Sequence, residues 1–339
     1  MNRQTAELRS ETLRMIREFF HGRGYLEVDP TPIATRPIPE STIELFCTEL
    51  LDPETGAAGA ADATRGPGGR PLFLLPSPEL PIKRAIAELD RSVYCISAAF
   101  RNMDARDRLH EPAFTMLEWY TRDADAPASI PLCTALISRL VEGLGSRCRL
   151  TATPEHVISL VQLFNDHLGV PLDAATSTDA LVSAAEKNGV SSPRGESWED
   201  LFHRLFVAVI EPALPDDGLV YVTDWPARIP TLAREQGGTG IAERWELYVG
   251  GVEVANCYSE ELRPDRVAQF LADEGERKAR ARVPHDHDPD FARLFDTNDF
   301  AGKIPAYSGV ALGLDRLVML LAGAESIQGV MYSPLSDMI

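Results

Sequence analysis

Basic charge is scarce in this 339-residue sequence. It has 33 lysine and arginine residues against 51 aspartate and glutamate residues, a formal net charge of −18. A protein that binds nucleic acid generally needs a basic surface to contact phosphates, so this balance argues against a general nucleic-acid binder. The same acidity suits partners or substrates that carry positive charge.

The sequence also lacks paired cysteines and long uninterrupted apolar runs. Its five cysteines are scattered without a Cys-x-x-Cys pair, which argues against a zinc site and favours a reducing compartment. The start, MNRQTAELRSE, has no apolar segment of the kind found in signal peptides. The apolar stretch GVALGLDRLVMLLAG is interrupted by Asp315 and Arg316, so we expect no membrane span there. These absences predict a cytoplasmic protein.

Apolar periodicity predicts an α+β fold. A helix is expected over residues 6–22, a surface loop over the glycine-rich residues 52–70, and mostly helix over about 130–215. Short strands are expected at SVYCISAAFRN, AFTMLEWYTRD, GLVYVTDWP, RWELYVGGVEVANCYSEE and SGVALG. Strands joined by turns between helical blocks predict a mostly antiparallel sheet flanked by helices.

Several polar side chains interrupt segments that otherwise predict buried strands. They are Arg101, His110, Glu118, Tyr120, Glu246, Glu253, Asn256 and Glu260, with Asp315 and Arg316 at a strand-to-helix junction. A buried charge is costly unless it is paired, so the simplest explanation is that these acids and arginines pair with one another. Two arginines cannot neutralise five carboxylates, however. The excess acid predicts an external cation such as Mg²⁺ or an amine.

Glu246 and Glu253 are seven residues apart across ELYVGGVE. Strand alternation alone would put them on opposite faces, but a turn or bulge at Gly250 and Gly251 would return both to one side. Mg²⁺ favours one or two carboxylates when substrate phosphates complete its coordination shell. Arginine forks suit those phosphates. Together these residues predict a site for magnesium and a nucleotide.

Three ordered segments resemble motifs 1, 2 and 3 of the class II aminoacyl-tRNA synthetases. These are the helix, strand and prolines of residues 12–32, FRN…HEPAFTMLEWY, and GVALGLDRLVML. SPELPIKR and AERWELYVGGVEVANCYSEE are most similar to the lysyl branch. Within that branch, TMLEWY and GVALG, with Ala311 where lysyl-tRNA synthetases commonly carry glycine, resemble the truncated paralogues that ligate lysine to elongation factor P.

The resemblance implies one class II catalytic domain over residues 1–339, with a helical insertion at about 130–215. No anticodon-binding domain is expected, because motif 1 begins almost at once. It also implies ATP and Mg²⁺ as cofactors, lysine or β-lysine as substrate, elongation factor P as acceptor, no tRNA partner, and a homodimer built through motif 1. Lysine would be activated as an adenylate and passed to a lysine side chain of the acceptor.

The resemblance also assigns roles to individual residues. Arg101 and Arg316 would act in catalysis by holding the α- and γ-phosphates of ATP. Asn102, His110 and Phe114 would complete the ATP site, with Phe114 stacked on adenine. Glu246 and Glu253 would bind Mg²⁺. The amino-acid pocket would be formed by Glu79, Glu118, Tyr120, Asn256, Tyr258 and Glu260.

Three positions depart from the family pattern. Met103 stands where the family has a glutamate that contacts the nucleotide, Ala113 replaces an acid, and Cys257 replaces a glycine. Asp104 would substitute for the missing glutamate if the loop shifts register. Two other functions stay open. One is a free-standing enzyme that activates another amino acid for another carrier, and the other is a non-catalytic paralogue that senses an amino acid or nucleotide.

Overall fold

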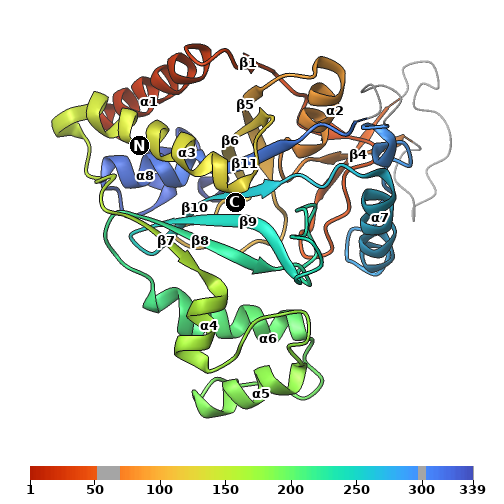
Figure 1. Cartoon of the computed structure of the whole chain (residues 1–339). Coiled ribbons are helices and arrows are strands. Elements are labelled where there is room, and N and C mark those ends of the chain that lie inside the picture. The colour runs from red at the N-terminus through yellow and green to blue at the C-terminus, as the bar shows by residue number, and fades with distance from the viewer. Residues whose placement is uncertain (52–68, 297–302, 339) are drawn as a thin grey trace.

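The computed structural model describes residues 1–51, 69–296 and 303–338 (Figure 1). The expected surface loop at 52–70 lies outside the described residues up to residue 68, and Arg70 already begins a strand. The described chain is organised around one large sheet with helices on both sides, as the sequence predicts for an α+β fold (Figure 1).

The large sheet has eight strands in the order β1-β5-β6-β11-β10-β9-β8-β7. Its pairs are antiparallel except for β1 with β5 and β7 with β8, which confirms the predicted mostly antiparallel sheet. Its strands are β1 (Leu26–Glu27), β5 (Val93–Phe100), β6 (Ala113–Arg122), β7 (Glu155–Ser159), β8 (Leu219–Pro226), β9 (Ile241–Val249), β10 (Val252–Ser259) and β11 (Tyr307–Gly313).

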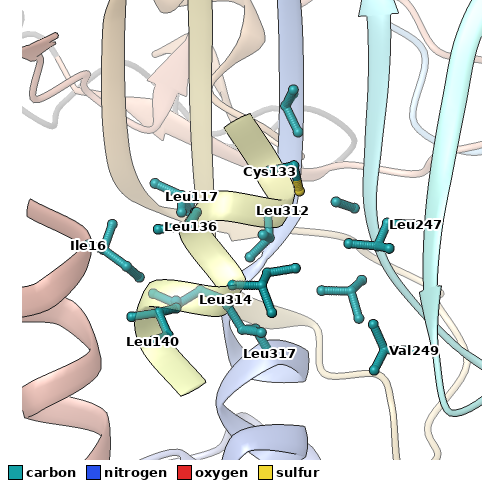
Figure 2. Packing of buried hydrophobic residues seen from close by; sticks show 14 of the residues in the cluster. Ile16, Leu117, Cys133, Leu136, Leu140, Leu247, Val249, Leu312, Leu314 and Leu317 are labelled. Carbon is teal, nitrogen blue, oxygen red and sulfur yellow. The ribbon is translucent and has the colours of Figure 1, made fainter. Parts of the chain in front are cut away.

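One face of this sheet is covered by α1 (Arg3–His21), α3 (Ala126–Leu144) and α8 (Leu314–Ala322) (Figure 1). Leu117, Leu247 and Leu312 point from the strands into this core, where they meet Ile16, Leu136, Leu140 and Leu317 from the helices (Figure 2). Because side chains alternate along a strand, the residues between these leucines face the opposite side of the sheet. That opposite side carries the candidate site.

The helix α3 is apolar and long enough, by length and composition, to cross a membrane. Its Leu136, Ile137 and Leu140 are fully buried, and it packs on α1, β9, β10 and β11. The hydrophobic core therefore accounts for its composition. The apolar stretch GVALGLDRLVMLLAG, for which the sequence predicts no membrane span, is divided between β11 and α8.

Residues 130–215 are largely helical, as the pattern predicts, but they also contain a strand that the pattern did not indicate. β7 lies in their middle and extends the sheet beside β8. After it come α4 (Leu160–Leu168), α5 (Thr178–Lys187) and α6 (Trp198–Leu205), which enclose a second hydrophobic cluster against β8. The rings of Phe164, Trp198 and Phe202 stack at its centre. A five-residue strand is too short to produce a periodicity that a sequence pattern can separate from the surrounding helices.

A second, three-stranded sheet lies beside the opposite face of the large one. It has the order β2-β4-β3, with β2 (Ile33–Ala34), β3 (Phe46–Leu50) and β4 (Arg70–Leu74). The helices α2 (Glu79–Leu89) and α7 (Pro264–Lys278) flank it (Figure 1). The buried Glu274 of α7 accepts a hydrogen bond from the backbone of Ser41 at 2.8 Å. This contact fixes the irregular segment that precedes β3.

Candidate active site

The register of β6, β11 and β10 places polar side chains side by side on one face of the sheet. Glu118 pairs with Ala311, which pairs with Asn256. Two residues along, Tyr120 pairs with Gly309, which pairs with Tyr258. Since alternate residues share a face, Glu118, Tyr120, Asn256 and Tyr258 all lie opposite the hydrophobic core.

The β9–β10 hairpin brings Glu246 and Glu253 to that same face. Its turn contains Gly250 and Gly251 with φ of 56° and 70°, the left-handed conformations that a tight hairpin turn requires. Glu253 pairs with Tyr248, two residues from Glu246, so the two acids share a side. The structure thus confirms the turn expected at these glycines. A bulge between Glu253 and Ala255 then lets Asn256 pair with Glu246, adding Asn256 to this face.

These side chains line a cavity of about 420 Å³. Twelve of the thirteen predicted site residues border it: Glu79, Arg101, His110, Phe114, Glu118, Tyr120, Glu246, Glu253, Asn256, Tyr258, Glu260 and Arg316. Asn102 is the exception. Its backbone N–H donates to the carbonyl of Glu44 at 2.8 Å, and its side-chain amide donates to the carbonyl of Leu45 at 3.4 Å, so it joins the loop to the segment before β3.

Lys83 is an internal cation that the sequence analysis missed. Its Nζ lies 2.6 Å from Glu79 Oε1 and 2.7 Å from Glu260 Oε2, and its side chain is 1% exposed. Burial disfavours the charged amine, but Glu260 and Glu79 outweigh burial and raise the pKa of Lys83 above its ordinary value. The spacing of Glu79 and Lys83 on one helix face was the available signal. Two of the pocket acids are therefore already paired.

Glu118 and Glu40 have no ion-pair partner within the described part of the chain. Glu118 is 2% exposed, and burial, followed by the charges of Glu79 and Glu260, raises its pKa well above its ordinary value. Glu40 also lines the cavity, although no periodic pattern marked it in the sequence. Burial and the charge of Glu79 raise the pKa of Glu40 to about 7. Together with Asp104, which also lines the cavity without an ion pair in the described part of the chain, these carboxylates hold the excess acid, and of the three Glu118 is the buried one.

Glu246 is bound by two neighbours on the same hairpin. Arg244 donates to its Oε1, and Tyr248 Oη donates to its Oε2 at 2.7 Å. Burial raises the pKa of Glu246 to about 7 against the opposing effect of Arg244, and the charge of Glu253 adds to the shift. Arg244 is a second internal cation absent from the sequence analysis, although it lies on the same strand face as Glu246.

The carboxylates of Glu246 and Glu253 fit a cation such as Mg²⁺ that completes its shell with substrate oxygens and water. No group of three or more histidine, cysteine, aspartate or glutamate residues within residues 1–51, 69–296 and 303–338 has the arrangement of a metal site. Mg²⁺ commonly binds through one or two carboxylates, with phosphates and water in its other positions. The adjacent acids Glu246 and Glu253, whose charges repel each other, match that mode.

Arg101 lines the cavity and has a hydrogen-bond donor without a partner among the described residues, so it is suited to bind an anion. Its guanidinium carbon lies 5.4 Å from the ring centroid of Phe114, and both residues line the cavity. Its Nε is buried and has no hydrogen-bond partner among the described residues. Buried polar groups normally have partners, so this donor marks a place for an external acceptor. Phosphate oxygens are acceptors that suit an arginine fork.

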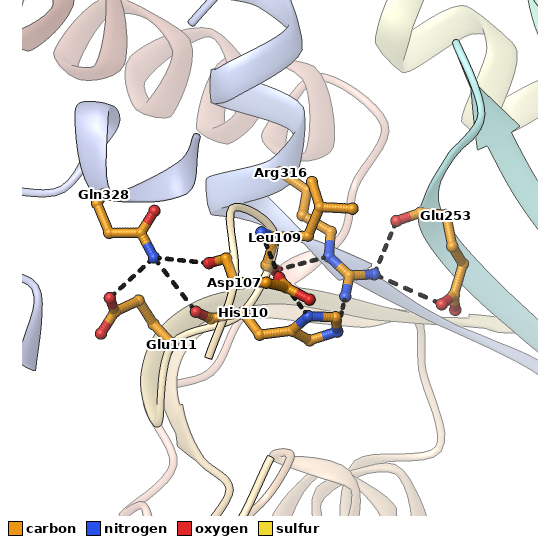
Figure 3. Close-up of polar contacts among 7 residues, drawn as sticks. All are labelled: Asp107, Leu109, His110, Glu111, Glu253, Arg316 and Gln328. Carbon is orange, nitrogen blue, oxygen red and sulfur yellow. Dashed lines mark hydrogen bonds and ion pairs between the residues drawn. The ribbon is translucent and has the colours of Figure 1, made fainter. Parts of the chain in front are cut away.

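Arg316 is held by contacts with the motif 2 loop, residues 101–112 between β5 and β6, and with β10 (Figure 3). It donates to the carbonyls of Leu109 at 3.2 Å and Glu253 at 2.9 Å, and its Nη2 lies 2.9 Å from His110 Nε2. Because arginine only donates, His110 Nε2 must be the acceptor. The ring proton therefore lies on Nδ1, which is 2.8 Å from Asp107 Oδ1.

The three departures from the family pattern have different structural consequences. Met103 is 60% exposed with φ of 60°, and it does not line the cavity, whereas Asp104 does. Ala113 begins β6 beside Phe100 and also lies outside the cavity lining. Cys257 faces the core, where it contacts Ser129, and burial raises the pKa of its thiol well above its ordinary value. A thiolate nucleophile at Cys257 is therefore disfavoured.

Comparison with known proteins identifies the family of the chain. The model of the class II tRNA synthetases for D, K and N matches residues 1–337. The elongation factor P–(R)-β-lysine ligase of Vibrio atlanticus is 31% identical, over 96% of this chain and 94% of its own. That of Yersinia enterocolitica is 32% identical, over 96% and 93%. The lysine–tRNA ligase of Pelotomaculum thermopropionicum is 31% identical, over 98% of this chain but 63% of its own. The chain belongs to the class II tRNA synthetase family of the D, K and N type.

Proposed function

We propose that this chain activates lysine or β-lysine with ATP and transfers it to a lysine side chain of elongation factor P. The observation that carries the proposal is the charge distribution of the cavity. Arg101 and Arg316, which suit phosphates, line the same cavity as Glu118 and Glu40, whose carboxylates lack ion-pair partners in the described structure. A nucleotide beside a diamino acid supplies a partner to both kinds of group.

The proposed reaction has two steps. A carboxylate oxygen of the amino acid attacks the α-phosphorus of ATP, forming the adenylate as the bond to the bridging oxygen breaks and pyrophosphate leaves. The acceptor amine then attacks the adenylate carbonyl, forming an amide as AMP leaves. Arg101 stabilises the negative charge that develops on the phosphate oxygens, and Arg316 holds the outer phosphates. Placement and electrostatics supply the catalysis, and no nucleophilic side chain is needed.

Glu246 and Glu253 are the residues that would hold Mg²⁺ in this proposal. Bound there, the ion would supply positive charge that offsets the charge of the phosphates. Tyr248 and Arg244 keep the Glu246 carboxylate oriented toward the cavity through the hydrogen bonds described above. Arg244 and Tyr248 therefore orient the proposed ligand Glu246, and hydrogen bonds of this kind are common around metal ligands.

The proposal extends to partners and location. The strongly acidic surface suits a protein acceptor better than tRNA, and we propose that tRNA is not a substrate. We also propose a cytoplasmic homodimer that associates through the motif 1 segment, with the five free cysteines in keeping with a reducing compartment. Sedimentation of the purified chain would test the dimer.

Amino-acid-dependent exchange of pyrophosphate into ATP tests the activation step. The panel contains lysine, both β-lysine isomers, ornithine, and norleucine, which has the four side-chain carbons of lysine but no side-chain ammonium. We expect exchange with the lysine-type compounds and none with norleucine. Exchange with an unrelated amino acid would favour the activating enzyme for another carrier, and binding without exchange would favour the sensing paralogue.

The variant Glu118→Gln sharpens this test. An ammonium about 4 Å from a carboxylate gains roughly 4 kcal/mol at an effective dielectric constant near 20, so losing the charge should raise the KM for lysine by up to about a thousandfold. The exposed Glu142 on α3, changed to glutamine, is the matched control. An unchanged KM in Glu118→Gln would overturn the assignment of this pocket to an amine. Labelling of elongation factor P by a radioactive amino acid tests the transfer step.

A further inference from the structure

The motif 2 loop is tied to a C-terminal segment, residues 327–336, that no part of the proposed reaction uses. Ile327 donates its backbone N–H to the carbonyl of Arg108 at 3.0 Å. Ser336 donates its backbone N–H to Glu111 Oε2 at 3.2 Å and its hydroxyl to Glu111 Oε1. These contacts join segments more than 200 residues apart in the sequence.

Residues 327–336 form a C-terminal brace for the loop, and Gln328 makes most of its contacts with the turn at His110 (Figure 3). Its Nε2 lies 3.0 Å from the carbonyl oxygen of Asp107, 3.3 Å from that of His110, and 3.0 Å from Glu111 Oε1. All three partners are acceptors, so the amide must present its NH₂ group to them. One side chain thus fixes both ends of the turn that carries His110.

Glu111 anchors the other side of the same contact. It is 2% exposed, and the Gln328 amide and Ser336 are the donors around its carboxylate. A buried carboxylate needs such donors, because leaving it unsatisfied is costly. The loop therefore cannot keep its position when these donors are lost, which links the brace to the placement of His110.

We propose that Gln328 is a positioning residue for the nucleotide end of the site. By fixing the backbone of Asp107 and His110, it holds the imidazole with Nδ1 on Asp107 and Nε2 on Arg316, and through that contact it sets the orientation of the Arg316 guanidinium. Among the described residues, Gln328 itself makes its hydrogen bonds to Asp107, His110 and Glu111, and it does not line the cavity.

The first test uses a readout that does not depend on activity. In the wild-type protein, ¹⁵N chemical shifts of His110, assigned by difference from His110→Gln, should show the neutral tautomer protonated at Nδ1. In Gln328→Met, which keeps the length and removes the donors, we expect a mixture of tautomers. Gln269 on α7 donates to Asp273 at 2.7 Å on the surface, and Gln269→Met is the matched control.

The second test rests on the proposed function. Gln328→Met should raise the KM for ATP about tenfold, the effect of one lost hydrogen bond to a buried acceptor, while the KM for the amino acid changes less than twofold. Gln328→Lys restores donors and should recover most of the ATP affinity. If Gln328→Met does not fold, the same pair of measurements on Ser336→Ala, which removes one donor to Glu111, decides the matter.

A wild-type tautomer signature together with an unchanged KM for ATP in Gln328→Met would overturn the proposal. Equal increases in both KM values, or no recovery with Gln328→Lys, would overturn it as well, since they indicate general destabilisation. If the chain activates no amino acid at all, the tautomer measurement still decides the inference, so the two failures are distinguishable.

Discussion

Gly309 should tolerate no side chain, because a Cβ atom at this position would lie too close to its neighbours. It lies in the middle of β11 between Tyr120 and Tyr258. A Cβ atom there would be 2.1 Å from Glu260 Oε1 and 2.6 Å from Tyr120 Cε1. Ordinary contacts are about 3.5 Å, so in Gly309→Ala both the Glu260 carboxylate and the tyrosine ring must move away, by roughly an ångström each.

The displacement has a definite functional cost. Moving the Glu260 carboxylate disturbs its 2.7 Å ion pair with Lys83 and narrows the space beside Glu118. Overpacking of this kind costs about 1–3 kcal/mol, which corresponds to roughly a 5- to 150-fold increase in the KM for the amino acid. The KM for ATP should stay within about twofold, because Arg101 and Arg316 do not contact Gly309.

Gly313→Ala is the matched control on the same strand. The three atoms nearest to its Cβ would all belong to the side chain of Arg316, at 3.6 Å or more, which are ordinary contacts. We expect it to leave the KM for the amino acid within twofold of wild type. Pyrophosphate exchange at varied ATP and amino acid gives both constants, and thermal unfolding checks the fold. The reasoning fails if Gly309→Ala binds the amino acid normally, or if the two variants raise its KM equally.

Two further predictions concern single charges. Arg101→Ala should raise the KM for ATP by about 10- to 150-fold, because a charge-assisted hydrogen bond to phosphate is lost, whereas the exposed Arg91→Ala should have no such effect; equal values would refute the phosphate role. Glu40→Gln should stabilise the protein at pH 8 but not below about pH 5. The folded-state pKa of Glu40, about 7, exceeds its ordinary 4.5, so the folded protein holds this proton more tightly and loses stability as the pH rises from 4.5 through 7. Urea unfolding at pH 5 and pH 8 measures the gain in the free energy of unfolding of Glu40→Gln over wild type. This gain should be larger at pH 8 by about 2 kcal/mol, a figure already reduced for partial exposure, and the exposed Glu276→Gln should show no such change.

Most of the cavity could be predicted because it is built on regular strands. Alternation fixes which residues of a strand share a face. A polar side chain inside an apolar run, such as Glu118 or Asn256, therefore indicates which face of the strand is polar. The turn at Gly250 and Gly251 follows the same logic. Once it is placed, Glu246 and Glu253 must lie together.

The remaining residues could not be found by pattern. Glu40 lies in an irregular segment whose position depends on the contact between Ser41 and Glu274, more than 200 residues away in the sequence. Lys83 lies on a helix, where a lysine is usually exposed, and only the packing of α2 on the sheet buries it. The spacing of four residues could have paired Lys83 with Glu79, but the burial of Lys83 and its contact with Glu260 depend on distant segments, as does the position of Glu40.

These missed residues change the electrostatic argument for the substrate. Lys83 neutralises part of the charge of Glu79 and Glu260, so the demand for an external cation is smaller than a count of acids suggests and is localised at the cavity acids without an ion pair in the described structure. An apolar amino acid would leave Glu118 buried without a partner, and burial, which raises the pKa of Glu118 well above its ordinary value, would then favour the neutral acid. An amine placed there gains the attraction and also lowers the repulsion from Glu260. The pocket therefore selects an ammonium group by its position, and it does so only while Lys83 keeps the other two acids satisfied.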